Sequence, residues 1–538
     1  MVSSLPEQLG EMGRVEIVSE RFAKVVVDSS RLRDVVSKLL GYGWRYVTSI
    51  GIDTRILDGW YRVLHLFTID APNTRYLAVE TRCSSGFPKI PSITVLVEGA
   101  DWSEREIRDL LGIDFVDHPV REPLIARPEL WKDLKPLRKD VPYNEKIAPR
   151  RVAEEPPKGF AIAVGPYHPA LHEPECFELV VDGERIVDAR YRGFMVHRGI
   201  EKLAEERLDI HQIPFVAERI CGICGFTHST AYCQAIEDAL KIDVPERALF
   251  VRSILLEIER IHSHLLWFGV LFHVLGLDVG FATMWRIREN VMDLAEVLTG
   301  NRKTYGMNIV GGVRRDIPDH VVPKAIEILR KVENEFRLFI DRLLSLPEVV
   351  KRTREVGILT REEARKLCVV GPVARASGIA MDVRRDKPYA AYRFVKIDVP
   401  TYDTCDVYAR ALVRRDEVLE SIRLAIYFLE NLPRTPLTVE DFGFHELREG
   451  IGATEAPRGE NVHYVMTGLA RKVYRWRVRA PSYANIPSVL KMLIGEKLCD
   501  APAIIASIDP CFSCTDRIVV IDRRYGTKRI LRLGEAHG

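Results

Sequence analysis

Two pairs of cysteines are the residues of this chain best suited to chemistry. Cys221 and Cys224 lie in "RICGICGFTH", near the middle of the sequence, and Cys511 and Cys514 lie in "DPCFSCTDR", close to its end. A Cys-x-x-Cys spacing lets both sulfurs reach one centre, and thiolates are soft donors that suit soft metal ions. The two pairs therefore predict one shared metal site.

The spacing alone leaves a structural zinc site and a redox disulfide open as alternatives. Zinc ribbons usually keep their two cysteine pairs close in sequence, and a redox motif needs only a single pair. In this chain Cys511 follows Cys224 by 287 residues. The separation favours a catalytic metal that is held across a whole domain.

The neighbours of the cysteines support a catalytic metal. Arg219 precedes the first pair and Arg517 follows the second. A nearby guanidinium group lowers the pKa of a thiol, which suits a metal-bound thiolate. His228 comes four residues after Cys224 and is placed to hydrogen-bond a ligating sulfur.

Composition excludes several other classes of protein. The 538 residues carry 78 basic and 76 acidic side chains, a net charge of +2, which argues against nucleic acid as a main partner. The first residues contain no apolar run of the kind found in secretory signals. Residues 261–277 are the most apolar stretch, but 17 residues with three histidines predict a buried helix rather than a membrane span. Six isolated cysteines do not suggest a disulfide framework, so a reducing cytoplasm is expected.

The apolar pattern predicts a mainly α fold that is preceded by a small α+β domain. Residues 1–130 combine short alternating segments, typical of strands, with a helix near 31–40. A second helix is expected from Asp101 onward, capped by Asp101 or Ser103. The charged segment 131–158 contains several prolines and no periodicity, which is typical of a linker.

The larger domain is expected to span residues 159–517 and to consist mainly of a helical bundle. It begins with a strand-like segment that contains an Asp-Gly turn, "ECFELVVDGERIVDARYR". Bundles often hold metal sites in their cores. Residues 518–538 form a C-terminal extension with two strand-like pieces. The helical segments expected in the bundle are 236–275, 325–344 and 407–429.

The two cysteine motifs closely resemble those of nickel–iron hydrogenase large subunits. The segments "HRGIEK" at 197–202 and "EAPRGE" at 455–460 resemble the Arg-Gly-x-Glu and Pro-Arg-Gly motifs of the same family, and "GMNIVGGVRRDI" resembles a segment of its membrane-associated branch. The N-terminal "DWSEREIRDLLGIDFVDHPVR" is similar to the 30-kDa subunit of respiratory complex I, whereas "GPYHPALHEPE" and "EIERIHSHLLWFG" are similar to its 49-kDa subunit. This combination is typical of the formate hydrogenlyase large subunit and its energy-converting relatives.

The resemblance implies a nickel–iron centre with four cysteine ligands. Cys221, Cys224, Cys511 and Cys514 would hold nickel, and Cys224 and Cys514 would also bridge to an iron that carries carbonyl and cyanide ligands. Hydrogen formation or cleavage at such a centre needs a base beside a Lewis-acidic metal. Cys511, as a terminal thiolate, or Arg458 could serve as this base.

Further roles follow from the same resemblance. Glu201 would be the first proton relay, since a dry site must release protons through groups that can titrate. Asp509 and Arg458 would form a polar canopy over the open metal position, where a guanidinium offers fixed donors. Arg517 stands where soluble uptake enzymes carry a metal-associated histidine, so their additional magnesium or iron site is not expected here.

The resemblance also implies partners. The six remaining cysteines are scattered singly and cannot hold an iron–sulfur cluster, so an iron–sulfur small subunit is expected to carry the electrons. Membrane-integral subunits would hold the chain at the inner face of the cell membrane, on the cytoplasmic side. Nickel and iron insertion factors and a maturation protease, which would cut between Arg517 and Ile518, are also expected.

The expected reaction is the reversible conversion of two protons and two electrons into H2. Hydrogen evolution would be coupled to the oxidation of formate, carbon monoxide or ferredoxin by partner subunits. The main alternative is a quinone-site subunit of the complex I type without a metal centre, in which His168 would be the residue to examine for a quinone. A zinc-stabilised scaffold is a third alternative.

Overall fold

The computed structural model describes residues 13–72, 74–125, 134–144, 175–194, 198–439 and 441–512, together with the backbone of 161–164. Cys514, His168 and Arg517 lie outside the described residues. So do the extension 518–538 and most of the linker, and their predicted structure and roles stay predictions.

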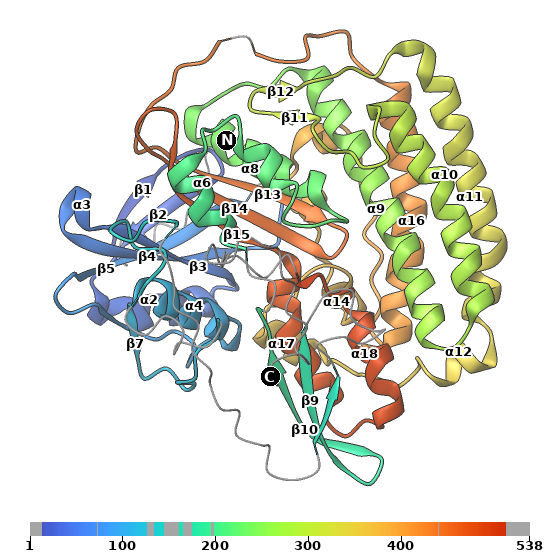
Figure 1. Ribbon diagram of the computed structural model, residues 1–538, viewed down its shortest axis with the longest axis horizontal. Helices are drawn as coiled ribbons and strands as arrows, with labels where there is room; N and C mark the ends of the chain where they lie inside the picture. The colour runs from blue at the N-terminus through green and yellow to red at the C-terminus, as the bar shows by residue number, and fades with distance from the viewer. Residues whose placement is uncertain are drawn as a thin grey trace, which may run out of the picture.

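The N-terminal part contains a five-stranded sheet with two helices on one face (Figure 1). Only β2 and β5 run parallel; the other neighbours are antiparallel. Helix α2 (Leu32–Gly41) buries Leu32, Val35, Val36 and Leu39, the stripe expected of an amphipathic helix. In order across the sheet, the strands are β1 (Arg14–Ile17), β2 (Phe22–Val26), β5 (Tyr76–Ser84), β4 (Trp60–Thr68) and β3 (Arg45–Thr54).

Helix α4 (Asp101–Leu111) lies where the sequence predicts a helix, but its predicted caps are wrong. Ala100 precedes the helix with φ −82° and ψ −17°, and no side chain caps the first turn. A 3-10 turn, Glu98–Ala100, leads directly into the helix, so the residue with the extended conformation of an N-cap is Val97, before that turn, and its side chain cannot cap. Asp101 instead accepts a hydrogen bond from Arg105 Nη1 at 3.0 Å.

Glu104 on α4 is a buried carboxyl group with an altered acidity. It accepts hydrogen bonds from Ser92 Oγ at 2.5 Å, from the Ile93 N–H at 2.8 Å and from Thr94 Oγ1 at 2.9 Å. Burial raises the pKa of Glu104 to about 7, although these hydrogen bonds oppose the shift. The native state therefore binds this proton more tightly than the unfolded chain does.

We expect Glu104→Gln to flatten the pH dependence of stability. The contribution of the protonated Glu104 is fully present below the unfolded pKa, near 4.5, and is lost as the pH rises toward 7. This contribution amounts to roughly 3 kcal/mol, which glutamine cannot lose because it does not titrate. The apparent melting temperature of the full chain, measured from pH 5 to pH 8, should fall less steeply with rising pH in the variant than in the wild type. Glu327→Gln, at an exposed position on helix α11 (Val322–Leu344), is the control, and curves of equal slope for all three proteins would refute the prediction.

A second sheet packs between the N-terminal sheet and a buried helix. Strands β13 (Glu449–Ala456), β14 (Gly459–Thr467) and β15 (Val473–Arg479) are antiparallel and adjacent in that order. On one face lies α8 (Gly225–Leu240), so close that a Cβ atom at Gly452 would lie 1.9 Å from the carbonyl oxygen of Ala231. On the other face, the ring of Tyr464 lies 6.2 Å from that of Phe22, which belongs to the N-terminal sheet. The sheet therefore joins the two parts of the chain.

Ion pairs also cross this boundary. Their partners come from the N-terminal strands or α4 on one side and from β13–β15 on the other, and most of these side chains are buried. Because buried pairs are costly to break, they fix how the two parts meet. The pairs are Lys24 with Glu449 at 2.8 Å, Arg45 with Glu460 at 3.1 Å and Arg477 with Glu106 at 2.6 Å.

Four long helices form the bundle at the right of Figure 1. The predicted segment 236–275 is two helices, because α8 ends at Leu240, Lys241 takes the left-handed conformation (φ 56°) and Pro245 precedes α9. Helix α10 was not among the predicted segments, although its buried Met284, Ile287, Val291 and Leu298 carry the helical period. The bundle helices are α9 (Glu246–Val274), α10 (Asp278–Thr299), α11 (Val322–Leu344) and α16 (Val407–Glu430).

Among the described residues, helices hold about 46% and strands about 20%, so the fold is mixed α/β rather than clearly mainly α, and the prediction is confirmed only in part. The prediction missed the sheet of the larger domain because β13 and β14 are buried on both faces and lack the alternation that marks half-exposed strands. The predicted strand-like segment is the hairpin of β9 (Cys176–Asp182) and β10 (Arg185–Arg192), which pairs with β8 (Ala161–Val164). None of the helices in the described part of the chain could cross a membrane.

The remaining elements are short. They connect the sheets and the bundle or lie at the edges of these layers. Those near the functional residues are α6 (Ile200–Arg207), α7 (Ile213–Ala217), α17 (Pro481–Leu493) and α18 (Ala501–Ser507). The others are α3 (Arg55–Asp58), β6 (Lys89–Pro91), β7 (Asp114–Val116), β11 (Asn308–Ile309), β12 (Gly312–Val313), α12 (Pro347–Lys351), α13 (Arg361–Lys366), α14 (Pro372–Ala376) and α15 (Val383–Asp386).

Candidate metal centre

Three of the four predicted cysteines lie in the interior. Cys221 and Cys224 belong to the loop between α7 and α8, and Cys511 follows α18. The Sγ atoms of Cys221 and Cys511 are 3.2 Å apart, although 290 residues separate them in the chain. Cys221 and Cys224 are 0% exposed and Cys511 is 4% exposed. The structure thus brings the mid-chain loop and the late loop to one buried point.

The donor chemistry at this point suits a soft metal. The three thiols form no disulfide, and they lie in one apolar cluster with α6, α7, α8 and β15. Within the described residues, no group of three His, Cys, Asp or Glu side chains converges closely enough to hold a metal ion. Cys514, the fourth predicted ligand, lies outside the described residues. The cysteines lie beside the β13–β15 sheet, and not in the core of the bundle as predicted.

Hydrogen bonds fix the loop that carries the first pair. Arg198 donates to the carbonyl oxygens of Arg219 and Ile220 at 2.6 and 2.8 Å, and the Tyr305 hydroxyl donates to the carbonyl of Cys221 at 3.0 Å. The Cys224 N–H lies 3.2 Å from the sulfur of Cys221. Because an N–H donor such as that of Cys224 stabilises a negatively charged sulfur, the loop favours the thiolate that a metal needs.

Glu259 on α9 holds the start of α8, directly after the second cysteine. Its two oxygens accept the N–H groups of Phe226 at 2.8 Å and Thr227 at 2.9 Å. The first N–H groups of a helix have no partner within the helix, so this carboxylate satisfies donors that burial would otherwise leave unpaired. Burial raises the pKa of Glu259 to about 7. The sequence prediction did not single out this residue, although it lies in the complex I-like segment "EIERIHSHLLWFG".

Arg458 and Asp509, which the resemblance predicts to lie over the metal position, are bonded to each other. Arg458 donates through Nε to the carbonyl of Asp509 at 2.6 Å and through Nη2 to its Oδ1 at 2.8 Å. A third contact, from Nη1 to Ser263 Oγ, measures 3.4 Å. Burial lowers the pKa of Arg458, but the charges of Asp509 and of the three cysteine thiolates outweigh it and raise the pKa overall. The guanidinium therefore stays charged beside the sulfurs.

The backbone around this pair is closely constrained. Pro457 and Arg458 form the two-residue turn between β13 and β14, and a Cβ atom at Gly371 would lie 2.3 Å from the carbonyl of Arg458. Asp509 has φ 55°, an uncommon conformation for a residue with a side chain. Its Oδ2 is buried and has no hydrogen-bond partner among the described residues.

Glu201 lies in the first turn of α6 and is 2% exposed. Its Oε2 pairs with Arg475 Nη1 at 2.7 Å, and its Oε1 accepts the N–H of Val478 at 3.0 Å. Both partners belong to β15. Ile200, the preceding residue, packs in the same apolar cluster as the three cysteines. Glu201 is thus an ion-paired carboxylate, and the residue that precedes it packs in the apolar cluster of the cysteines.

His228 lies in α8 and its ring pairs with His463. The two nitrogens, His228 Nδ1 and His463 Nε2, are 3.1 Å apart, and Trp476 Nε1 donates to His463 Nδ1 at 3.2 Å. With neutral rings, His463 must donate through Nε2, so His228 accepts at Nδ1 and carries its proton on Nε2. The ring therefore presents a donor, as the prediction of a hydrogen bond to sulfur requires.

Arg219 is not placed as the sequence suggests. Its side chain is 54% exposed and its Nη1 lies 2.7 Å from Glu218 Oε2. The same nitrogen donates to the carbonyl of Phe215 at 2.8 Å. These contacts hold the charge at the surface with Glu218 and give no support for a role in thiol acidity.

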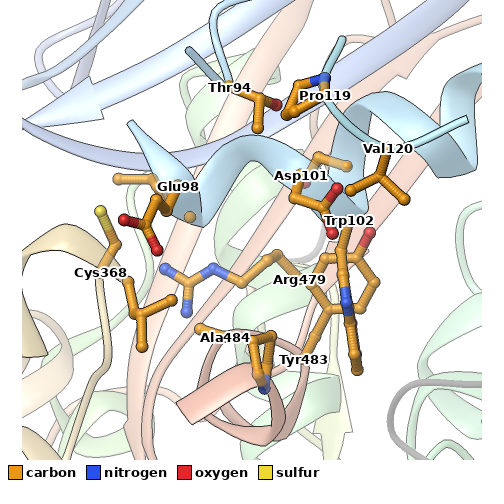
Figure 2. A pocket seen from close by; sticks show the side chains of 15 residues that line it. Thr94, Glu98, Asp101, Trp102, Pro119, Val120, Cys368, Arg479, Tyr483 and Ala484 are labelled. Atoms are coloured by element: carbon orange, nitrogen blue, oxygen red, sulfur yellow. The ribbon is translucent and has the colours of Figure 1, made fainter. Parts of the chain in front are cut away.

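A separate cavity of about 250 Å³ lies between the N-terminal part and the larger part of the chain. Glu98, Asp101 and Trp102 line it from one side and Cys368, Arg479 and Tyr483 from the other, and the Arg479 guanidinium points toward Glu98 (Figure 2). None of the predicted catalytic residues lines this cavity. It is therefore distinct from the cysteine cluster.

Family models match most of the chain. The model of the nickel-dependent hydrogenases matches residues 198–342. The model of the 49 Kd subunit of respiratory-chain NADH dehydrogenase matches residues 275–446 and 443–517, and that of the 30 Kd subunit matches residues 25–146. The family models therefore confirm both resemblances seen in the sequence, to nickel–iron hydrogenase large subunits and to subunits of complex I.

Individual relatives agree with the family models. Formate hydrogenlyase subunit 5 of Escherichia coli is 43% identical over 91% of this chain and 87% of its own length. Hydrogenase-4 component G of Escherichia coli is 41% identical over 93% of this chain and 89% of its own. A solved structure of the membrane-bound sulfane sulfur reductase, an archaeal respiratory membrane complex, contains a chain with a TM-score of 0.64 and 31% identity, covering 67% of this chain and 98% of that one.

The fold and the buried cysteines define the class of large subunits that is shared by nickel–iron hydrogenases and complex I. Within this class, the chain belongs to the family of energy-converting nickel–iron hydrogenase large subunits of the formate hydrogenlyase type, with a fused domain of the complex I 30-kDa kind. The family predicted from the sequence is confirmed. The chain is an oxidoreductase of the hydrogenase class.

Proposed function

We propose that Cys221, Cys224, Cys511 and Cys514 hold a nickel–iron centre at which protons and electrons are converted reversibly into H2. The observation that carries this proposal is the contact between the sulfurs of Cys221 and Cys511, at 3.2 Å. Nickel–iron centres supply a Lewis acid beside a basic ligand. Cys224 and Cys514 would also bridge to the iron, which would carry carbonyl and cyanide ligands.

The chain's own residues would prepare this site for proton chemistry. Arg458 holds fixed donors beside the three described cysteines, and its bond to Asp509 Oδ1 leaves the buried Oδ2 of that residue without a hydrogen-bond partner among the described residues. Cys511 would accept the proton at the metals, because Arg458 already carries its proton as a charged guanidinium. Glu201 would be the first relay, a proposal supported by its Arg-Gly-x-Glu motif, its burial and the packing of Ile200 against the cysteine cluster. His228 would donate a hydrogen bond to a ligating sulfur.

Partners would supply the electrons and the membrane attachment. An iron–sulfur small subunit would pass electrons, and membrane-integral subunits would hold the chain at the cytoplasmic face of the membrane. Hydrogen evolution would be coupled to the oxidation of formate, carbon monoxide or ferredoxin. Insertion factors and a maturation protease would complete the site. The chain would divide into residues 1–130, a linker over 131–158, residues 159–517 and a removable extension 518–538.

The test is hydrogen production by the purified complex with a reduced viologen dye, together with an infrared spectrum. We expect H2 formation, nickel and iron in the protein, and carbonyl and cyanide stretching bands. A quinone-site subunit of the complex I type would show none of these, and a zinc scaffold would contain zinc alone. Absence of both nickel and activity would overturn the proposal.

A further inference from the structure

A cluster of charged residues leads outward from Glu201. Arg475 Nη1 lies 2.7 Å from Glu201 Oε2 and 2.9 Å from Glu205 Oε1, so one guanidinium nitrogen binds both carboxylates. Glu201 and Glu205 are four residues apart on α6 and therefore lie on the same face of this helix. The shared nitrogen holds the two carboxylates within two hydrogen-bond lengths of each other.

The outer carboxylate reaches a cleft that is open to solvent. Glu205 Oε2 lies 2.6 Å from Lys139 Nζ, whose side chain is 13% exposed. Lys139 and Glu205 line a cleft of about 390 Å³, together with Glu206, Lys472 and Tyr474. The cleft thus begins where the buried cluster ends. The Glu205 side chain is itself buried, 1% exposed, as are those of Glu201 and Arg475 at 3% and 5%, so Lys139 is the member of the cluster that meets solvent.

The electrostatics of the cluster assign the mobile proton to the carboxylates. Burial lowers the pKa of Arg475, but the charges of Glu201 and Glu205 outweigh it, so the pKa is raised. Arg475 therefore keeps its proton throughout. Arg475 Nη1 also donates to the carbonyl oxygen of Trp476, and its Nε donates to the carbonyl oxygen of Gly51 at 2.9 Å, which fixes it to the N-terminal sheet. A fixed cation between two carboxylates positions both without taking part in the transfer.

We propose that Glu205 is the next proton-carrying residue after Glu201, and that the route reaches water in the cleft beside Lys139. The inference rests on the proposed role of Glu201. In the direction of H2 oxidation, the Glu201 carboxylic acid loses its proton and becomes a carboxylate, while the Glu205 carboxylate gains the proton, through one bridging water or a small side-chain rotation. Glu205 then releases the proton to a water molecule in the cleft. No electrons move in these steps, and the reverse order delivers protons for H2 evolution.

Two exchange reactions of the purified complex test this route. Conversion of parahydrogen to orthohydrogen needs cleavage at the metals only, whereas formation of HD from D2 in ordinary water also needs proton exchange with solvent. In Glu205→Gln, we expect HD formation to fall at least about tenfold relative to parahydrogen conversion, because glutamine cannot carry the proton. Glu205→Asp keeps a carboxylate on a shorter side chain, and its ratio should be intermediate.

The matched control is Glu237→Gln, which alters another buried carboxylate that pairs with an arginine, Arg252, at 2.7 Å. Its exchange ratio should equal that of the wild type. A wild-type ratio in Glu205→Gln, or an equal fall in both reactions with nickel retained, would overturn the proposal. If Glu205→Gln fails to bind nickel, Glu205→Asp decides, and a wild-type ratio there would contradict the route. Failure of the proposed function itself would differ, since the wild-type complex would then lack nickel and both reactions.

Discussion

Replacing Cys511 by alanine is expected to abolish both nickel binding and H2 formation. Its sulfur lies 3.2 Å from that of Cys221 and is buried, so no water or neighbouring side chain can readily take its place. Loss of residues that merely support a metal ligand already costs about 10–100-fold in affinity or activity. Loss of a ligand should cost more than this. Elemental analysis and the viologen assay on the purified complex measure both effects.

The control for this experiment is Cys233→Ala. Cys233 is also 0% exposed and lies in α8, in the same apolar cluster, but it belongs to neither cysteine pair. Burial raises the pKa of its thiol, which is the property of a packing residue and not of a metal ligand. We expect this variant to keep its nickel. Equal nickel content in Cys511→Ala and Cys233→Ala would contradict the assignment of Cys511.

Arg458→Lys is expected to reduce H2 formation by about 100- to 1000-fold while nickel remains bound, the range seen when one fixed donor is removed from an active site. Arg458 makes two hydrogen bonds to Asp509 in a fixed geometry, at 2.6 and 2.8 Å. Lysine carries a compact ammonium group that cannot reproduce this fork. The viologen assay gives the rate, and the infrared spectrum shows whether the metals are still in place.

Arg252→Lys serves as the matched control, because Arg252 is also a fully buried arginine with two hydrogen bonds to one carboxylate, that of Glu237. It should lose stability without a selective loss of rate per nickel. If Arg458→Lys keeps the wild-type rate per nickel, the canopy assignment is wrong. If both variants lose the same fraction of rate per nickel, the effect of Arg458 is structural and the assignment also fails.

The sequence located the cysteines and most of the long helices because these features have strong local signals. The stripe of buried residues along α11, from Ala325 to Ile340, follows directly from the helical period. Cys221 and Cys224 could be recognised from their spacing and motif. That their loop lies near Cys511 could be inferred only from the hypothesis of a shared metal. The contact itself, at 3.2 Å, depends on the tertiary fold.

The features that the sequence did not predict are those that depend on tertiary packing and not on a local sequence pattern. Strand β13 is flanked by a helix and a sheet, and Gly450 and Gly452 are required by the close approach of α8. The pairing of His228 with His463, and the placement of Arg219 at the surface, depend on elements that are distant in the chain. Glu205 could not be identified from the sequence for the same reason, because its proposed role depends on its ion pair with Arg475 on β15.

The most direct test of the account is nickel K-edge X-ray absorption spectroscopy of the purified complex, compared with the same measurement on Cys511→Ala. Thiolates are the donors that the four cysteines offer. The account predicts that sulfur supplies the protein ligands of nickel, that a neighbouring iron is detected, and that the variant loses the nickel signal or one of its sulfur ligands. A nickel ion bound through nitrogen or oxygen alone, or a spectrum unchanged in the variant, would contradict it.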